Sequence, residues 1–202
     1  TSCDAPWGYH RVVGLMVASQ VMGDKRWINW GVEKIFPNIY LCLVGNSGIR
    51  KTTALNCGLS VMSSLPLVFR EETEFSGICK KPKMRVELVN AWNESNRSVM
   101  AAVSLEWFDY NIDRKNLLES LLSRFFYAVE TKQEVVFPIP PARNEELFNG
   151  VVKGLKCLGS LPSGQMILAP EAEKFYSDWA KGLIERAETY PKLMPVFKRL
   201  PV

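Results

Sequence analysis

The chain has 202 residues, of which 47% are hydrophobic and 23% are charged, and its formal net charge is +4 at pH 7. This length and apolar share suffice for a packed core and exclude disorder throughout. The mild positive charge permits a nucleic-acid partner without arguing for one, because a DNA-binding surface needs clustered charge. No apolar run reaches the roughly 18 residues of a membrane span and no signal-peptide pattern opens the chain. We therefore expect a cytoplasmic protein without membrane contact.

The cysteines and the lone histidine do not follow a metal-binding or disulfide pattern in the sequence. The five cysteines are scattered and odd in number: Cys3, Cys42, Cys57, Cys79 and Cys157. None belongs to a CxxC motif or to a Cys/His pair with zinc-ligand spacing. The lone His10 supports neither a zinc site nor a catalytic triad. We expect reduced thiols and no disulfide framework.

The first third of the chain predicts a strand followed by a loop and a helix. Apolar residues in segment 9–22 recur at spacings of three and four, which predicts a well-buried helix. Segments 26–30 and 39–44 are short and rich in β-branched and aromatic residues, and the second is almost wholly apolar, like a strand covered on both faces. Segment 52–65 has helical spacing and ends at Pro66, which cannot continue a helix interior.

The middle of the chain has little periodicity. Between residues 67 and 115, short apolar pieces such as 100–103 are separated by charged stretches. Segment 117–129 indicates a helix or a helix that runs into a strand, and 134–141 indicates a strand closed by prolines.

The last third is predicted to be helical. Segments 145–158 and 169–187 have the spacing of amphipathic helices, and the second has Pro170 at a first-turn position. We therefore divide the chain into a core at 1–140 and a helical carboxy-terminal part of the same domain at 141–202.

The loop after the 39–44 strand carries a phosphate-binding pattern. In a P-loop, G-x-x-x-x-G-K-[ST], backbone N–H groups wrap the phosphates, a lysine reaches them and a hydroxyl binds Mg²⁺. Lys51 supplies the cation and Thr52 the magnesium ligand, so the expected cofactors are ATP and Mg²⁺; Arg50 departs from the pattern, which has glycine there. The candidate binding residues are Gly45, Asn46, Ser47, Gly48, Ile49, Arg50, Lys51, Thr52 and Thr53. A plain strand-to-helix turn with an exposed lysine is the alternative.

These residues resemble a known family. Segment 36–44 with the Gly-Asn-Ser-Gly-Ile-Arg-Lys-Thr-Thr loop is similar to the P-loop ATPase domain of primase-helicase-like replication proteins from phages and mobile elements. Proteins of this family typically have arginine before the loop lysine, as Arg50 is here. Segments 6–27, 122–126 (Leu-Ser-Arg-Phe-Phe) and 167–179 also resemble the family.

The resemblance implies a fold and an activity. It implies an α/β, RecA-like domain with a mostly parallel sheet flanked by helices and a helical carboxy-terminal appendage. It also implies ATP hydrolysis coupled to movement on single-stranded DNA, as in a replicative helicase, in a homo-oligomer such as a hexameric ring.

The resemblance further implies two catalytic residues besides Lys51. Glu74 lies at the position of the family's catalytic glutamate, and Arg124 is the candidate for a charge at the γ-phosphate, in cis or from a neighbouring subunit. The alternative for Arg124 is an arginine at the end of the 117–126 element whose charged group reaches water. No apolar strand ending in Asp-Glu is found. The spacings from the loop to Glu74 and on to Arg124 are short for such a domain, and we expect the chain to be a fragment in which internal segments are absent.

Other interpretations remain open. A nucleotide or small-molecule kinase shares the loop but needs an acceptor pocket, and a nucleotide-dependent interaction module needs no catalytic acid. Arg50 is placed to reach either a phosphate or a subunit interface. The basic run at 80–85 suits a loop on single-stranded DNA or a solvated loop.

Overall fold

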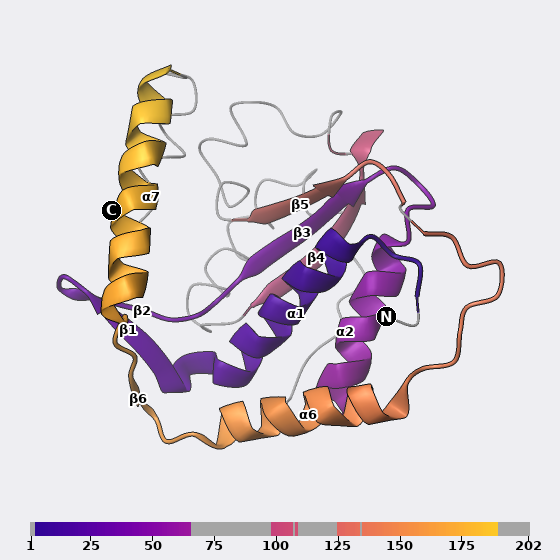
Figure 1. Cartoon of the computed structure of the whole chain (residues 1–202), viewed down its shortest axis with the longest axis horizontal. Coiled ribbons are helices and arrows are strands. Elements are labelled where there is room, and N and C mark those ends of the chain that lie inside the picture. The colour runs from indigo at the N-terminus through magenta and orange to yellow at the C-terminus, as the bar shows by residue number, and fades with distance from the viewer. Residues whose placement is uncertain (1–2, 66–97, 107, 109–124, 134, 190–202) are drawn as a thin grey trace, which may run out of the picture.

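In the computed structural model, the residues described are 3–65, 98–106, 108, 125–133 and 135–189. They form an α/β structure, as the sequence predicts (Figure 1). The principal sheet has three strands in the order β4-β3-β5, and both of its pairings are parallel. Its strands are β3 (Tyr40–Gly45), β4 (Val99–Ser104) and β5 (Phe126–Glu130).

The central strand β3 determines where the sheet ends. Its sequence Tyr-Leu-Cys-Leu-Val-Gly is buried from Leu41 to Gly45, because strands lie on both sides of it. Gly45, its last residue, pairs in register with Ser104 of β4 and with Glu130 of β5. The carboxyl ends of all three strands therefore meet at one edge, the place where ligands bind in open parallel sheets.

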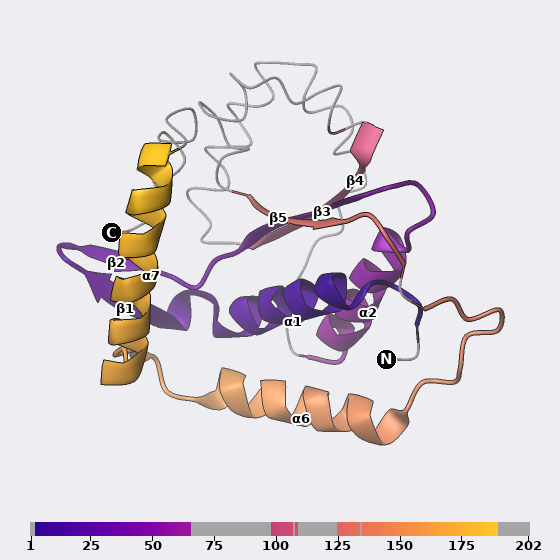
Figure 2. The ribbon, with the colours of Figure 1, turned by 45° about the horizontal axis from the view of Figure 1, so that its top comes forward.

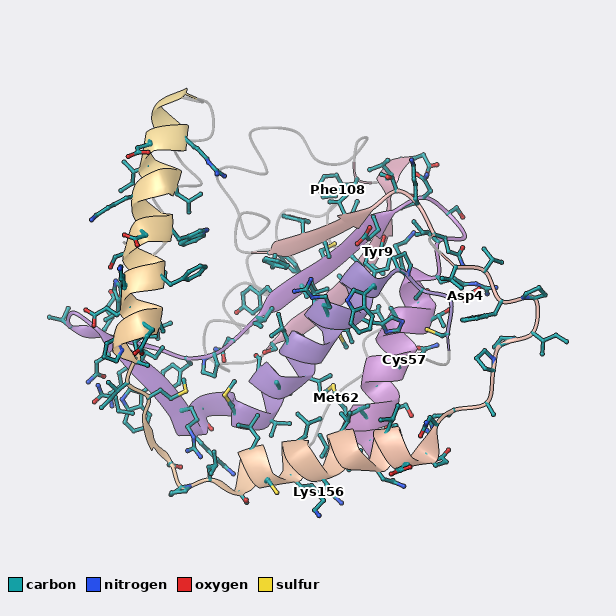
Figure 3. All side chains as sticks on the ribbon, in the orientation of Figure 1. Asp4, Tyr9, Cys57, Met62, Phe108 and Lys156 are labelled. Atoms are coloured by element: carbon teal, nitrogen blue, oxygen red, sulfur yellow. The ribbon has the colours of Figure 1, made fainter. Side chains whose placement is uncertain are left out.

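Two helices cover one face of this sheet. Figure 2 shows α1 (Trp7–Met22) and α2 (Lys51–Ser63) side by side against the strands, with α6 (Glu145–Ser160) across their outer side. The core between these elements is apolar: Tyr9, Val13, Met16 and Val17 from α1, Ala54 and Met62 from α2, Leu41 and Leu43 from β3, and Val152 from α6. Lys156 lies on the exposed side of α6 and points away from this core (Figure 3).

The helix α1 is fixed to the carboxyl end of the sheet by one buried side chain. The Tyr9 hydroxyl donates to the Val44 carbonyl at 2.7 Å and lies 3.4 Å from the Glu130 carbonyl. Burial raises the pKa of Tyr9 to about 12. This contact joins α1, β3 and β5 at the edge where the loop begins.

A second, small sheet lies away from that edge. Its central strand β1 (Arg26–Trp30) pairs antiparallel with β2 (Glu33–Ile35) and parallel with β6 (Gly164–Gln165). The helix α7 (Pro170–Thr189) follows, and its Tyr176 ring meets the Trp30 ring edge-on at 5.2 Å. Between α1 and β1 the chain makes one 3₁₀ turn, η1 (Gly23–Lys25).

Most elements predicted from the sequence are confirmed with small shifts at their ends. The predicted helices at 9–22 and 52–65 are α1 and α2, and those at 145–158 and 169–187 are α6 and α7. The strands predicted at 26–30 and 39–44 are β1 and β3. No helix in the described part of the chain has the length and apolar character that crossing a membrane requires.

The strand predicted at 134–141 is wrong. Residues 135–141 form neither strand nor helix, and all of them except Phe137 are exposed. Pro138, Pro140 and Pro141 cannot donate to a ladder, and no strand among the described residues pairs with this segment. Of the predicted 117–129 element, residues 126–129 belong to β5, and residues 117–124 lie outside the described ranges.

Candidate functional site

The loop from Gly45 to Lys51 joins the end of β3 to the start of α2. Gly45 admits no side chain, because a Cβ there would overlap the Tyr9 hydroxyl and lie 2.5 Å from the Glu130 carbonyl oxygen. Gly48 has φ +84°, a conformation that side chains disfavour. The two glycines of the predicted motif are thus required by the backbone, one by close approach and one by its dihedral angle.

Arg50 adopts a left-handed backbone conformation, which glycine adopts more easily than other residues. Its φ is 63° and its ψ is 28°, in the left-handed region, which costs a non-glycine residue about 1 kcal/mol or more. Its Nε lies 3.3 Å from the Asp4 carboxylate, which is only 5% exposed. The sequence left open a phosphate or a subunit interface as the partner of Arg50; within the chain, its side chain forms an ion pair with Asp4 and also lines the cavity described below.

Lys51 is the first residue of α2 and folds back over the loop. Its Nζ donates to the Gly45 carbonyl at 2.7 Å and to the Asn46 carbonyl at 2.8 Å. Burial lowers the pKa of Lys51, and the Glu106 carboxylate opposes that shift. Two carbonyl oxygens therefore hold the ammonium group at the loop.

The first N–H groups of α2 have no side-chain cap among the described residues. Arg50 occupies the N-cap position without a capping bond, and the first intrahelical bond runs from the Ala54 amide to the Arg50 carbonyl at 3.1 Å. A helix leaves its first amides without intrahelical partners, and its dipole makes this end favourable for anions. The amides at 51–53 and the Lys51 ammonium thus present positive charge at one place.

A cavity of about 410 Å³ lies against this helix start. That volume is within the usual range for small-molecule sites. Its walls come from the loop, the first turn of α2 and the carboxyl end of β4: Ser47, Gly48, Arg50, Lys51, Thr52, Thr53, Ala102, Val103 and Ser104. Six of the predicted binding residues therefore line one cavity, whereas the Ile49 side chain is buried in the core.

Two acidic residues at the strand ends were missed in the sequence. Glu106 follows β4 by two residues, and its charge acts on Lys51. Glu130 ends β5, directly beside Gly45. The signal for Glu106 was an apolar run, 99–103, followed closely by an acidic residue. The predicted catalytic residues Glu74 and Arg124, and the basic run at 80–85, lie outside the described residues.

Comparison of the chain with protein-family models, curated proteins and solved structures found no match.

Proposed function

We propose that the 45–52 loop binds the phosphates of ATP with Mg²⁺, and that the chain is a RecA-like P-loop ATPase. One observation carries this proposal: the Lys51 ammonium and the uncapped start of α2 converge on a cavity at the carboxyl end of a parallel sheet. A lysine and free amides at a helix start are the elements with which proteins hold phosphate groups.

Each group of the proposed site has its own role in binding or hydrolysis. The Lys51 ammonium exchanges the Gly45 and Asn46 carbonyls, at 2.7 and 2.8 Å, for the β- and γ-phosphate oxygens. The Thr52 hydroxyl would hold the Mg²⁺ ion, which would neutralise negative charge on the phosphates. Loop amides would stabilise the charge that develops on the γ-phosphoryl group as water attacks its phosphorus and the bond to the departing ADP breaks.

For the catalytic acid we propose Glu106, in addition to the sequence-based candidate Glu74. Glu106 follows the strand next to β3, and its charge already acts on Lys51. A carboxylate at such a strand end can orient the attacking water, whereas Glu74 has only the family resemblance in its favour.

We expect a Glu106→Gln variant to bind ATP normally and to hydrolyse it about 10²–10⁴-fold more slowly, the usual contribution of a positioned acid or base. Single-turnover hydrolysis measures this directly. Glu146→Gln, on the exposed side of α6, is the matched control and should be unaffected. Full activity in Glu106→Gln combined with loss in Glu74→Gln would return the role to Glu74.

The resemblance extends the proposal to the work done with ATP. We propose that hydrolysis drives movement on single-stranded DNA in a homo-oligomeric ring, in which Arg124 of one subunit reaches the nucleotide of the next. Fold and loop specify nucleotide binding, whereas the coupled work depends on surfaces and partners.

The test is the steady-state rate of ATP hydrolysis with and without single-stranded DNA. Lys51→Ala removes the loop ammonium and should abolish nucleotide binding, whereas Lys153→Ala removes an exposed lysine of α6 and should change nothing. A rate that rises with DNA supports the motor. Nucleotide binding that is unchanged in Lys51→Ala contradicts the proposed site.

Two results would favour the other interpretations. Hydrolysis that needs a small phosphate acceptor and ignores DNA indicates a kinase. Nucleotide binding without turnover, under all of these conditions, indicates an interaction module that responds to nucleotide.

A further inference from the structure

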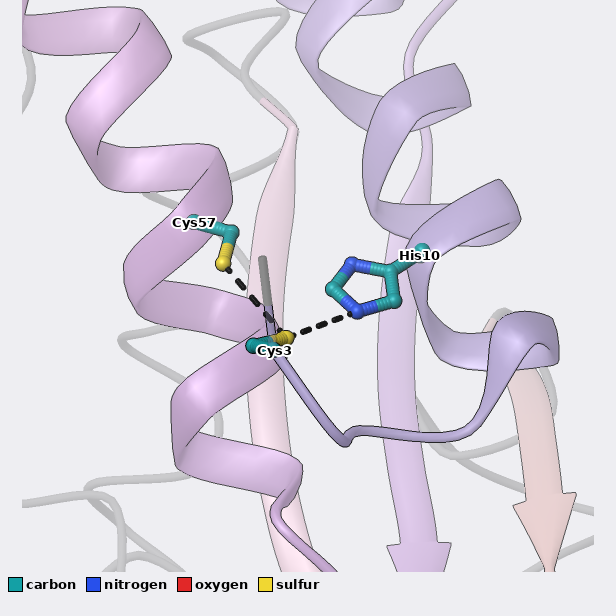
Figure 4. Close-up of side chains that lie close together, drawn as sticks. All are labelled: Cys3, His10 and Cys57. Carbon is teal, nitrogen blue, oxygen red and sulfur yellow. Dashed lines mark hydrogen bonds between the residues drawn. The ribbon is translucent and has the colours of Figure 1, made fainter. Parts of the chain in front are cut away.

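Three side chains that can bind a metal ion meet beside α2, although they are far apart in the sequence. Cys3 comes from the segment before α1, His10 from α1 and Cys57 from α2 (Figure 4). The Cys3 sulfur lies 3.0 Å from His10 Nε2 and 3.9 Å from the Cys57 sulfur. All three ligand atoms lie within 4.8 Å of one another, and each residue is half-buried.

These distances are close to those of a tetrahedral zinc site. Zinc–sulfur bonds of about 2.3 Å and zinc–nitrogen bonds of about 2.0–2.1 Å place two bound sulfurs about 3.8 Å apart and a sulfur and a nitrogen about 3.6 Å apart. The observed sulfur–sulfur distance of 3.9 Å matches the first value. The sulfur–nitrogen distance of 3.0 Å is about half an ångström shorter than the second, so the imidazole has to move only slightly outward.

The donor set also selects the ion. Two thiolates and an imidazole are soft to borderline ligands, which favour Zn²⁺ over Mg²⁺ or Ca²⁺. Three protein ligands leave the fourth tetrahedral position for water or another ligand. The sequence did not indicate this site because its ligands lie on three segments, with Cys3 and Cys57 separated by 54 positions.

We propose that Cys3, His10 and Cys57 form a Zn²⁺ site that fastens the segment before α1 to α2. Cys3 is adjacent to Asp4, the partner of Arg50, and Cys57 is on the helix that begins with Lys51. The ion would therefore fix the segment that contains Asp4 relative to the helix that begins with Lys51. The zinc site does not depend on nucleotide binding, so the two proposals can fail separately.

The test is a titration of the reduced, metal-free full chain with Co²⁺, a spectroscopic substitute for Zn²⁺. We expect one equivalent to bind, with a thiolate-to-cobalt band in the near ultraviolet and the visible bands of tetrahedral cobalt. Added Zn²⁺ should displace both signals. The intensity of the first band reports how many thiolates bind, so the wild-type chain alone gives a decisive result.

Matched variants assign the ligands. Cys57→Ser and His10→Ala should weaken cobalt binding by more than the roughly 10–100-fold that loss of an outer-shell partner causes. Cys157→Ser changes an exposed cysteine on α6 and should bind Co²⁺ as the wild type does. Circular dichroism of each variant shows whether it is folded before its affinity is compared.

Three results would overturn the proposal. The first is a wild-type titration without a thiolate-to-cobalt band. The second is unchanged affinity in a folded Cys57→Ser variant. The third is a Cys3–Cys57 disulfide found by mass spectrometry in protein that resists reduction and binds no metal, which would make the pair a covalent link.

Discussion

Arg50 occupies a backbone conformation that glycine adopts more easily, and its side chain explains how it stays there. Its left-handed dihedral angles are unfavourable for any L side chain, but its guanidinium contacts a carboxylate with 5% exposure. The second oxygen of that carboxylate has no hydrogen-bond partner among the described residues. Asp4 therefore depends on Arg50 more than an exposed acid would.

A double-mutant cycle tests this dependence. Arg50→Gly relieves the backbone strain but leaves the Asp4 charge without its partner, so we expect it to lower the free energy of unfolding. In an Asp4→Asn background the strain relief alone remains, and the same substitution should be neutral or stabilising. Urea denaturation of the four proteins measures both effects. Equal effects in the two backgrounds would show that the ion pair contributes nothing.

Tyr9 makes the free energy of unfolding depend on pH in the alkaline range. Its folded-state pKa of about 12 exceeds the ordinary value of 10.0, because burial disfavours the phenolate. The unfolded chain therefore loses this proton first, so the stabilisation is complete below about pH 10 and is lost as the pH rises towards 12. Absorbance of the phenolate should show a late-titrating tyrosine in the folded wild type that is missing from a Tyr9→Phe variant.

The Tyr9→Phe variant separates the hydroxyl from the ring. It loses the bond to the Val44 carbonyl, so we expect a loss of about 1 kcal/mol in unfolding free energy near pH 8. The difference between wild type and variant should shrink above pH 10. A constant difference across that range would mean that the hydroxyl does not titrate late.

At the scale of elements, α1 and α2 approach each other at Gly58. A Cβ at this position would lie 2.5 Å from a Val13 methyl carbon and 3.5 Å from one of Val17. We expect Gly58→Ala to destabilise by about 1–3 kcal/mol through overpacking, despite its better helix propensity.

The matched control is Gly154→Ala in α6, where a Cβ would meet nothing within 4 Å. There only the helix propensity changes, so we expect a gain of up to about 1 kcal/mol. Thermal unfolding of both variants should therefore shift in opposite directions. Val13→Ala combined with Gly58→Ala should recover part of the loss, because it makes room for the new methyl group.

The elements that could be predicted are those with a strong local signal. The helix α1, the strand β3 and the helix α6 have clear periodicity or a long apolar run, and their ends shift by only a few residues. The sequence indicates β4 only as a short apolar piece, because its partner β3 is distant in the sequence. The strand prediction at 134–141 was wrong although the local signal was present. Apolar residues form a strand only where a neighbouring strand pairs with them.

In the candidate site, too, only the residues of a contiguous motif could be predicted from the sequence. The 45–52 loop has a contiguous motif, and the structure brings most of it to one cavity. Glu106 and the Cys3, His10 and Cys57 cluster have no such motif, because strand pairing and helix packing bring them together. Local spacing in a single sequence gives no signal for contacts of that kind.

At the scale of the whole molecule, ligand binding should stabilise the fold. If ATP and Mg²⁺ bind only the folded chain, a nucleotide concentration of 100 times the dissociation constant adds about 2.7 kcal/mol. The wild type and Lys153→Ala should show the corresponding rise in melting temperature. Lys51→Ala should show none; a rise in that variant too would place the nucleotide elsewhere.

The contacts of the amino-terminal segment have a consequence for synthesis. Tyr9 meets the Glu130 carbonyl across 121 positions, and the Asp4 carbonyl accepts from Gln133 across 129 positions. A chain that leaves the ribosome from its amino terminus cannot complete these contacts until β5 has emerged. Closing such long loops is slow, so we expect α1 and the 45–52 loop to reach their final packing only after β5 is synthesised. Until then the apolar face of α1 can bind chaperones.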